Sequence, residues 1–213
     1  MSIHASGSNF ISNAAILVWM QEKTDGIYGH MREAMDTSNT RAGAEDALNT
    51  IKGKLGDLKA KNATPEEVQD LINQAMHDFP DVPEVAKVLG PYSDDLSAQV
   101  RAATIGVQGA RWQLQALEAE ASRSGSAIPS YTAARIAALR EEATPKPLSI
   151  GSDKADSWAK NIGTTVEGLG KQDQLGLINI QEFNAQLNQA KQTASALMDA
   201  ADKAANSIIN NIA

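Results

Sequence analysis

Apolar side chains recur every three and four residues toward the C-terminus of the chain. They are Ile180, Phe183, Leu187, Ala190, Ala194, Leu197, Ala201, Ala204 and Ile208. A seven-residue repeat places such side chains along one side of a helix, and a second helix must cover them. Met198, Ala205 and Ile212 widen this apolar stripe, and no proline interrupts it. The pattern predicts one coiled-coil helix over residues 173–213.

The N-terminal part carries a weaker pattern of the same kind. Its apolar positions form one stripe at Leu17, Met20, Ile27, Met31 and Ala34 and another at Ala44, Leu48, Ile51, Leu55 and Leu58. Residues 14–20 are apolar on every side, which is typical of a segment covered by several neighbours. Residues 37–41 are small and polar, so a bend, a register shift or an exposed stretch is expected there. We predict one long helix over residues 13–60.

The middle of the chain, residues 61–172, is expected to be an inserted and mostly helical region. Thr64 is a good N-cap, and Pro65 suits the first position of a helix. A second heptad pattern extends from Val100 to Ala121. The helices predicted here cover about residues 65–79, 94–123, 131–142 and 153–169.

Three prolines, Pro80, Pro83 and Pro91, leave room for only a short helix over residues 84–89. Residues 144–147 should form an extended connector. A small β-hairpin around residues 148–150 is an open alternative to continued irregular structure.

Together these elements predict an all-α fold. Its main feature is a long antiparallel coiled-coil hairpin of the N- and C-terminal helices, with the middle region inserted at its head. Composition agrees, because 35 of the 213 residues are alanine and there are only three each of Phe, Trp and Tyr. Small side chains favour thin packing of helix on helix.

The sequence offers no candidate for a catalytic or cofactor site. Cysteine is absent, which excludes disulfides and thiolate chemistry. His4, His30 and His77 lack the spacing of a helical metal-binding pair. Residues 168–171 read Gly-Leu-Gly-Lys but lack the rest of a phosphate-binding loop. We therefore expect no enzyme, no cofactor and no metal.

Charge and hydropathy narrow the possible partners. The formal net charge of −7 argues against nucleic acid, which needs a basic face. No run approaches the roughly 20 apolar residues of a membrane-spanning helix. Residues 1–12 are polar and contain no Lys or Arg, so they do not predict a cleaved signal peptide. The chain then either stays in the cytoplasm or is exported by a different route.

The segment Ala14-Ala15-Ile16-Leu17-Val18-Trp19-Met20, followed by a long and weak helix, resembles the N-terminal helix of the EspA family. These are the filament-forming translocator proteins of type III secretion systems. The heptad helix near the C-terminus is similar to the other half of that pattern, and also to the C-terminal helix of needle-tip proteins. The likeness covers about residues 10–60 and 173–213.

The resemblance implies a structural subunit of an extracellular needle-extension filament. Such subunits assemble through their terminal helices into a hollow helical tube that carries effectors toward the host cell. Residues 1–12 would be an uncleaved export segment, and the protein would be secreted to the bacterial surface. The implied partners are further copies of the chain, the type III needle subunit, the pore-forming translocators and a cytoplasmic chaperone before export.

The expected self-assembly residues lie on both terminal helices. On the N-terminal helix they are Ile16, Leu17, Trp19, Met20, Ile27 and Met31, and on the C-terminal helix they are the heptad positions from Ile180 to Ile208 together with Ile212. Three alternatives stay open. The chain could form a small needle-tip cap, act as a secreted effector, or serve as a cytoplasmic helical scaffold.

Overall fold

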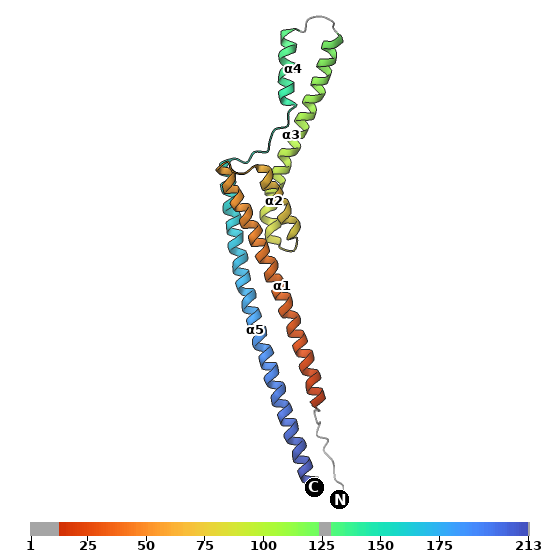
Figure 1. The fold of residues 1–213 in the computed structure, drawn as a ribbon, viewed down its shortest axis with the longest axis vertical. Coiled ribbons are helices and arrows are strands. Elements are labelled where there is room, and N and C mark those ends of the chain that lie inside the picture. Colours follow the sequence, from red (N-terminus) through yellow and green to blue (C-terminus); the bar gives the residue numbers. More distant parts are fainter. Residues whose placement is uncertain (1–12, 124–128, 213) are drawn as a thin grey trace. The chain divides into compact units, whose positions relative to one another are not determined.

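The computed structural model describes residues 13–123 and 129–212, and in these ranges it contains five α-helices and no strand. They are α1 (Asn13–Lys59), α2 (Pro65–Asp78), α3 (Pro83–Arg123), α4 (Ser130–Glu142) and α5 (Ser152–Ile212). The predicted all-α fold is therefore confirmed (Figure 1). Of the two alternatives left open for residues 148–150, the irregular one is found, because residues 145–151 form an irregular connector between α4 and α5. The predicted export segment, residues 1–12, lies outside the described residues.

The chain divides into two compact units. One consists of the residues up to Ala42 together with those from Gly170 onward, and we call it the terminal unit. The other is the central unit, Gly43–Leu169. Both α1 and α5 contribute to each unit, because neither helix is interrupted at the division.

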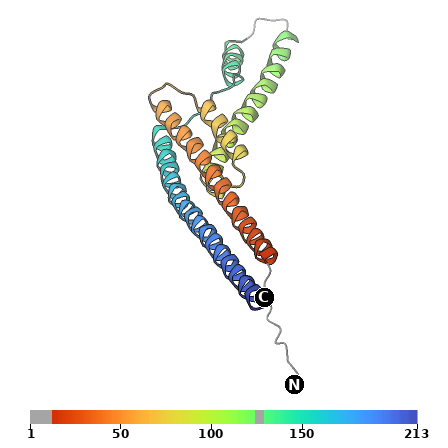
Figure 2. The ribbon, with the colours of Figure 1, turned by 60° about the horizontal axis from the view of Figure 1, so that its bottom comes forward.

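In the terminal unit, α1 and α5 lie side by side in opposite directions (Figure 2). Ser38 donates a hydrogen bond to the carboxylate of Asp173. Further along, the rings of His30 and Phe183 stack with centroids 5.9 Å apart. Near the chain ends, the side-chain amide of Asn13 donates to Asp202 over 2.9 Å. As the number of the α1 residue falls, that of its α5 partner rises, which defines an antiparallel register.

The central unit contains the bulkiest apolar core. Its fully buried side chains come from the second half of α1, from α2, from the start of α3 and from the start of α5. The largest of them are Leu48, Ile51, Leu55, Val68, Ile72, Val85, Leu89, Leu96, Ile162 and Leu169. Leu, Ile and Val fill such a core in well-defined rotamers, so this part of the chain has the better-packed interior.

Local sequence signals explain where α2 begins. The Thr64 side chain accepts a hydrogen bond from the backbone N–H of Glu67 over 3.3 Å, and Pro65 occupies the first helical position. The cap satisfies one of the free N–H groups at the start of the helix, and Pro has no N–H to satisfy. Residues 66 and 67 are acidic and suit the positive end of the helix dipole.

Helix α3 begins earlier than expected. It starts at Pro83 and includes Pro91 in its interior, so the predicted break before residue 94 is wrong. A proline inside a helix loses one hydrogen bond and costs about 3 kcal/mol. Val85, Leu89, Tyr92 and Leu96 are all buried on one face across the proline, and their packing offsets that cost.

Helix α5 is also longer than expected. The predicted helices over residues 153–169 and 173–213 are one continuous helix. Polar and glycine residues between Leu169 and Ile180 hid this continuity. Gln172, Asp173 and Gly176 nevertheless keep the heptad spacing and are half-buried.

An aromatic pair joins α3 to α5 inside the central unit. The rings of Tyr92 and Trp158 stack with centroids 4.3 Å apart and planes 18° from parallel. The Asn161 side chain donates to the Tyr92 hydroxyl over 3.0 Å. The pair places the start of α5 against the Pro91 region of α3.

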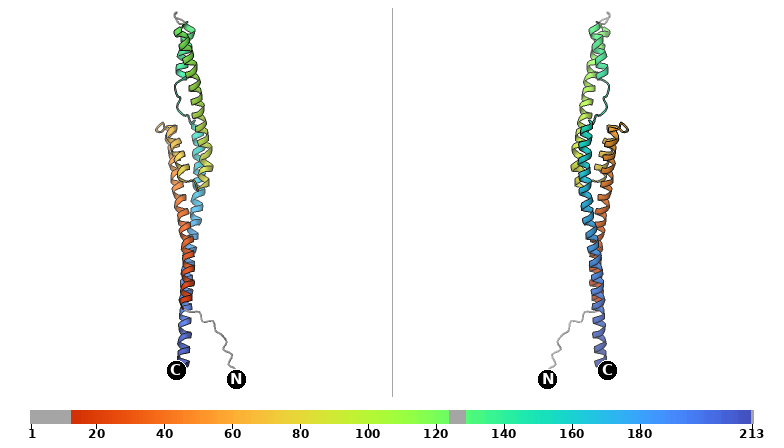
Figure 3. Two further views of the ribbon diagram at one scale, coloured as in Figure 1. Left: turned by 90° about the vertical axis from the view of Figure 1, so that its right-hand side faces the viewer. Right: turned by 90° about the vertical axis from the view of Figure 1, so that its left-hand side faces the viewer.

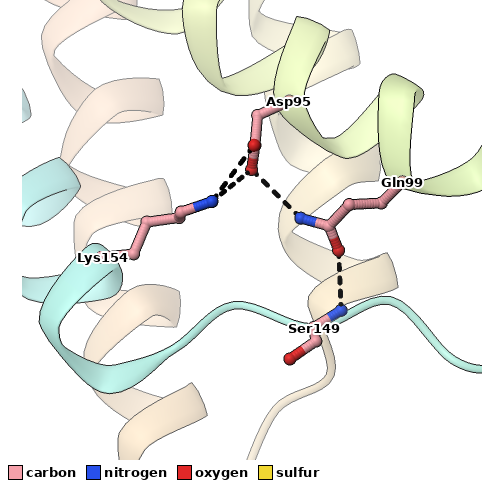
Figure 4. A network of polar contacts seen from close by, with 4 residues as sticks. All are labelled: Asp95, Gln99, Ser149 and Lys154. Atoms are coloured by element: carbon pink, nitrogen blue, oxygen red, sulfur yellow. Dashed lines mark hydrogen bonds and ion pairs between the residues drawn. The ribbon is translucent and has the colours of Figure 1, made fainter.

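Polar contacts hold the connector before α5 in place (Figure 4). The Lys154 ammonium lies 2.9 and 3.1 Å from the two carboxylate oxygens of Asp95. Gln99 donates to the same carboxylate over 3.1 Å, and its carbonyl accepts from the backbone N–H of Ser149 over 3.0 Å. These groups satisfy one another and form a structural network.

Helices α3 and α4 form an antiparallel pair at one end of the central unit (Figure 3). Ile136 and Leu139 of α4 are buried, as are Val107 and Ala110 of α3. The Arg140 guanidinium donates to Glu118 over 2.7 Å at the edge of the contact. One face of α3 is thereby covered by α4.

Candidate self-assembly surface

The contact between α1 and α5 in the terminal unit contains most of the residues expected from the sequence. Ile16 and Ile27 of α1 are buried, and Met20 and Met31 are half-buried. On α5 the buried or half-buried members are Ile180, Phe183, Leu187, Ala190, Ala194 and Ala201. These side chains hold the hairpin of one molecule together.

Beyond Ala194 the predicted heptad positions are only partly covered, because Ala201 is half-buried but two others are not. Leu197 is 39% exposed and Ala204 is exposed. Met198 and Ala205, which the sequence predicted to widen the stripe, are half-buried. The spacing along α5 therefore contains two successive steps of four, from Ala190 to Ala194 and from Ala194 to Met198. An extra step of four is a stutter, which locally unwinds the coiling of two helices.

Helix α1 contains a matching irregularity. Its covered positions run from Ile16 to Met20 and Thr24, again in two steps of four, before Ile27 restores the step of three. The antiparallel register, fixed by the pairs Asn13–Asp202 and His30–Phe183, brings Met20 level with Ala194. The two stutters therefore coincide, which explains why Leu197 turns away from α1.

Several large apolar side chains are exposed at this level. On α1 they are Leu17, Val18 and Trp19, which are 51%, 57% and 38% exposed, and on α5 Leu197 adds to them. Successive helical residues point about 100° apart, so the three side chains of α1 face three different directions. We call these four residues the terminal belt.

A second group of exposed apolar side chains lies further along the terminal unit. It consists of Met35 on α1 and Leu175, Leu177 and Ile178 on α5, which are 49–61% exposed. The pair Ser38–Asp173 places Met35 at the level of these α5 residues. We call this group the inner belt. Its members do not follow the heptad, so the periodic pattern of the sequence does not predict them.

Mainly polar residues lie between the two belts on both helices, and Tyr28 of α1, which is 51% exposed, is the large side chain among them. Gln21, Glu22, Lys23 and Asp25 are exposed on α1. The exposed positions of α5 between the belts are mainly Gln and Asn, with Gln186 on the same side of the helix as Leu197. The 18 residues from Leu17 to Met35 correspond to about 27 Å along a helix.

Two expected assembly residues, Ile208 and Ile212, have side chains outside those that the structure describes.

Within the described residues, no group of three or more His, Asp and Glu side chains is placed to hold a metal. No described helix combines the length and apolarity that crossing a bilayer requires. The central unit has an open groove of about 390 Å³ between α2, α3 and the connector, with Glu66, Arg111 and Lys146 at its polar edge.

Comparisons with known proteins return no match: no family model, no curated protein and no solved structure is similar to this chain.

Proposed function

We propose that the chain is a structural subunit that polymerises through its terminal unit. The carrying observation is the presence of two apolar belts at different levels of one antiparallel hairpin. Isolated exposed apolar residues are ordinary, but groups of them mark sites of association. Within one molecule, Leu17, Trp19 and Leu197 have only partial cover. A second copy would remove them from water.

The separation of the belts favours an open polymer over a closed pair. When the terminal belt of one copy packs on the inner belt of the next, the first copy still has a free inner belt. The second copy still has a free terminal belt. When the copies point in the same direction, such a contact joins two different surfaces, and it extends indefinitely unless the rotation closes a ring. The distance along α1 then suggests an axial step of about 27 Å or a fraction of it.

The resemblance to the EspA family gives this polymer a biological form. In our proposal the chain builds an extracellular type III filament that extends the secretion needle toward a host cell. The needle subunit and the pore-forming translocators would be the neighbours at its two ends. A cytoplasmic chaperone would cover the belts before export, since exposed apolar groups promote premature association.

Electron microscopy and sedimentation of the purified full-length chain test the assembly. We expect long tubes from the wild type and soluble protein from Leu17→Asp and from Leu197→Asp, because a carboxylate in a buried contact is strongly unfavourable. Gln186→Asp is the matched control, since it lies three turns from Leu197 on the same side of α5 between the belts. Circular dichroism would verify that all variants stay helical.

Polymers from both belt variants like those of the wild type would refute the role of the terminal belt. Closed rings of a few copies would instead refute the open contact and favour a tip cap. For the export proposal, the protein should be found in culture supernatant only when the type III apparatus is active. Its retention in cells with an active apparatus would contradict the extracellular assignment.

A further inference from the structure

Helix α3 carries a second heptad stripe on the face that points away from α4. Its positions alternate in steps of four and three, and every one of them is exposed. They are Ala98, Ala102, Ile105, Gly109, Trp112, Ala116 and Ala119. Ile105 and Trp112 are 70% and 80% exposed, the latter more than any other large apolar side chain among the described residues. A heptad stripe of three repeats is the pattern that another helix covers.

No residue that the structure describes covers this face. The residues of α3 that contact α4, such as Val107 and Ala110, lie on the other side of the helix. Toward the start of α3 the same face stays exposed at Lys87, Pro91 and Asp94. The outer face of α3 is therefore open along its whole length, and we call its heptad positions the α3 stripe.

The order of side-chain sizes along the α3 stripe is the same in both directions. Gly109 lies at the centre, a large residue flanks it on each side at Ile105 and Trp112, and alanines follow at both ends. A helical glycine costs about 1 kcal/mol relative to alanine. A Cβ at Gly109 would meet no atom within 4 Å, so packing within one copy does not require glycine there.

We propose that a second copy of this chain pairs with the α3 stripe in the antiparallel direction, about a two-fold axis near Gly109. Ile105 of each copy then lies beside Trp112 of the other, and the two Gly109 residues meet at the axis, where they make room for the indole rings. Such an interface is self-complementary and closes after two copies. It uses the central unit alone, so it is independent of the proposed polymer contact.

Charge complementarity selects the antiparallel direction. In this register Asp94 of one copy lies level with Arg123 of the other, at both ends of the interface. Both side chains are exposed on the outer face of α3, and together they span 30 residues, or about 45 Å of helix. A parallel pairing would place Asp94 beside Asp94 and Arg123 beside Arg123, and like charges are unfavourable. The exposed neighbours of Gly109 and Trp112 are the neutral Gln108, Gln113 and Gln115 together with Arg111, which lines the groove beside α2 and points about 100° from Trp112 around the helix.

Cysteine cross-linking of the full-length chain tests the register. Because the chain has no native cysteine, every disulfide that forms joins introduced residues. Gly109→Cys should form a covalent dimer with itself under mild oxidation. Ile105→Cys and Trp112→Cys should cross-link when mixed but not singly, because seven residues, about 10 Å along a helix, would separate identical positions. Ala134→Cys, an exposed position on α4, is the control for random encounters.

Sedimentation of the same chain measures the affinity. Trp112→Asp should weaken the dimer at least tenfold, whereas Tyr131→Asp, at a residue 76% exposed on α4, should leave it unchanged. Asp94→Arg and Arg123→Asp should each weaken it, and the chain that carries both substitutions should recover. The measurements are repeated in the Leu17→Asp background, so that loss of the polymer and loss of the dimer are scored separately.

Cross-linking of Gly109→Cys no faster than Ala134→Cys would overturn the proposal. So would self-linking of Ile105→Cys alone, which indicates a parallel pair, or a double charge reversal that fails to recover. A chain that stays monomeric at high concentration in the Leu17→Asp background would equally exclude a second copy as the partner.

Discussion

Two leucines on α5 provide a sharp test of the stutter in the terminal unit. The strict heptad places Leu187 and Leu197 in the same contact, but Leu187 is 6% exposed and Leu197 is 39% exposed. Leu187→Ala removes a side chain enclosed between α1 and α5 and leaves a cavity, so it should lower the free energy of unfolding by about 2–4 kcal/mol. Leu197→Ala removes a partly exposed side chain without creating a closed cavity, and the loss should be about 1 kcal/mol or less.

Hydrogen exchange of the α5 amides in dilute, unassembled protein is the suitable assay, because it reports on the terminal unit separately from the central unit. Met198→Ala serves as the third variant. Met198 is half-buried, so Met198→Ala should lower the free energy of unfolding by more than Leu197→Ala does. Equal costs for Leu187→Ala and Leu197→Ala, with little effect of Met198→Ala, would refute the stutter and restore the regular heptad.

The order of the effects should reverse in assembly. Leu197 belongs to the terminal belt, so Leu197→Ala should raise the concentration needed for polymerisation while it leaves the single molecule nearly unchanged. Leu187→Ala should act on the polymer only through the stability of the hairpin. A stability-matched comparison of the two variants by light scattering separates these routes.

Gly43→Ala should lower the free energy of unfolding, measured by urea titration, by about 1 kcal/mol, because the new Cβ would lie 2.9 Å from Cε1 of Phe79. Gly53→Ala should raise it by up to about 1 kcal/mol, since its Cβ meets nothing within 4 Å and alanine is the better helix former. Tyr92→Phe should cost about 0.5–1.5 kcal/mol in the same assay, because the hydrogen bond from Asn161 is lost while the ring stacking stays. A stabilising Gly43→Ala or a neutral Tyr92→Phe would contradict these packing and bonding assignments.

The bounds of α1 and α4 and the start of α2 were predictable from the sequence. α1 and α4 were expected over 13–60 and 131–142 and are found as Asn13–Lys59 and Ser130–Glu142. The start of α2 at Pro65 follows from a cap that needs only Thr64 and the next few residues. Such signals act over one turn of helix, and the rest of the fold does not change them.

The extents of α3 and α5 were not predictable by the same means. Pro91 is a strong local signal against a helix, and only the burial of residues before and after it, against distant parts of the chain, overcomes it. In α5 residues 170–174 are polar or glycine, and the apolar Leu175, Leu177 and Ile178 that follow do not fit the heptad, so no apolar period continues after Leu169. Contacts such as Ser38 with Asp173 hold that stretch through a side-chain hydrogen bond.

The choice between Leu197 and Met198 shows why a periodic pattern alone leaves the register open. Both residues are apolar and adjacent, so the sequence of α5 permits either step. The decision depends on α1, where Ile16, Met20 and Thr24 follow steps of four at the same level. These α1 residues lie nearly 180 residues away from Met198 in the chain, and they affect its burial only because the two helices pair in the antiparallel direction.

The packing of the two units suggests how folding and association are related. The contact of α5 with α1 consists largely of small residues, including Gly176, Ala190, Ala194 and Ala201, whereas the central unit buries many Leu, Ile and Val side chains. Less apolar area is buried per residue in the terminal unit, and long helices with little tertiary cover are marginal. Anything that binds the folded form stabilises it by mass action. Covering the terminal and inner belts would therefore order the same helices that carry them, while the central unit keeps its fold in either state. On this view the exposed Leu17 and Leu197 contribute little to the stability of a single subunit. Their side chains stabilise the protein mainly after association, when a second copy covers them.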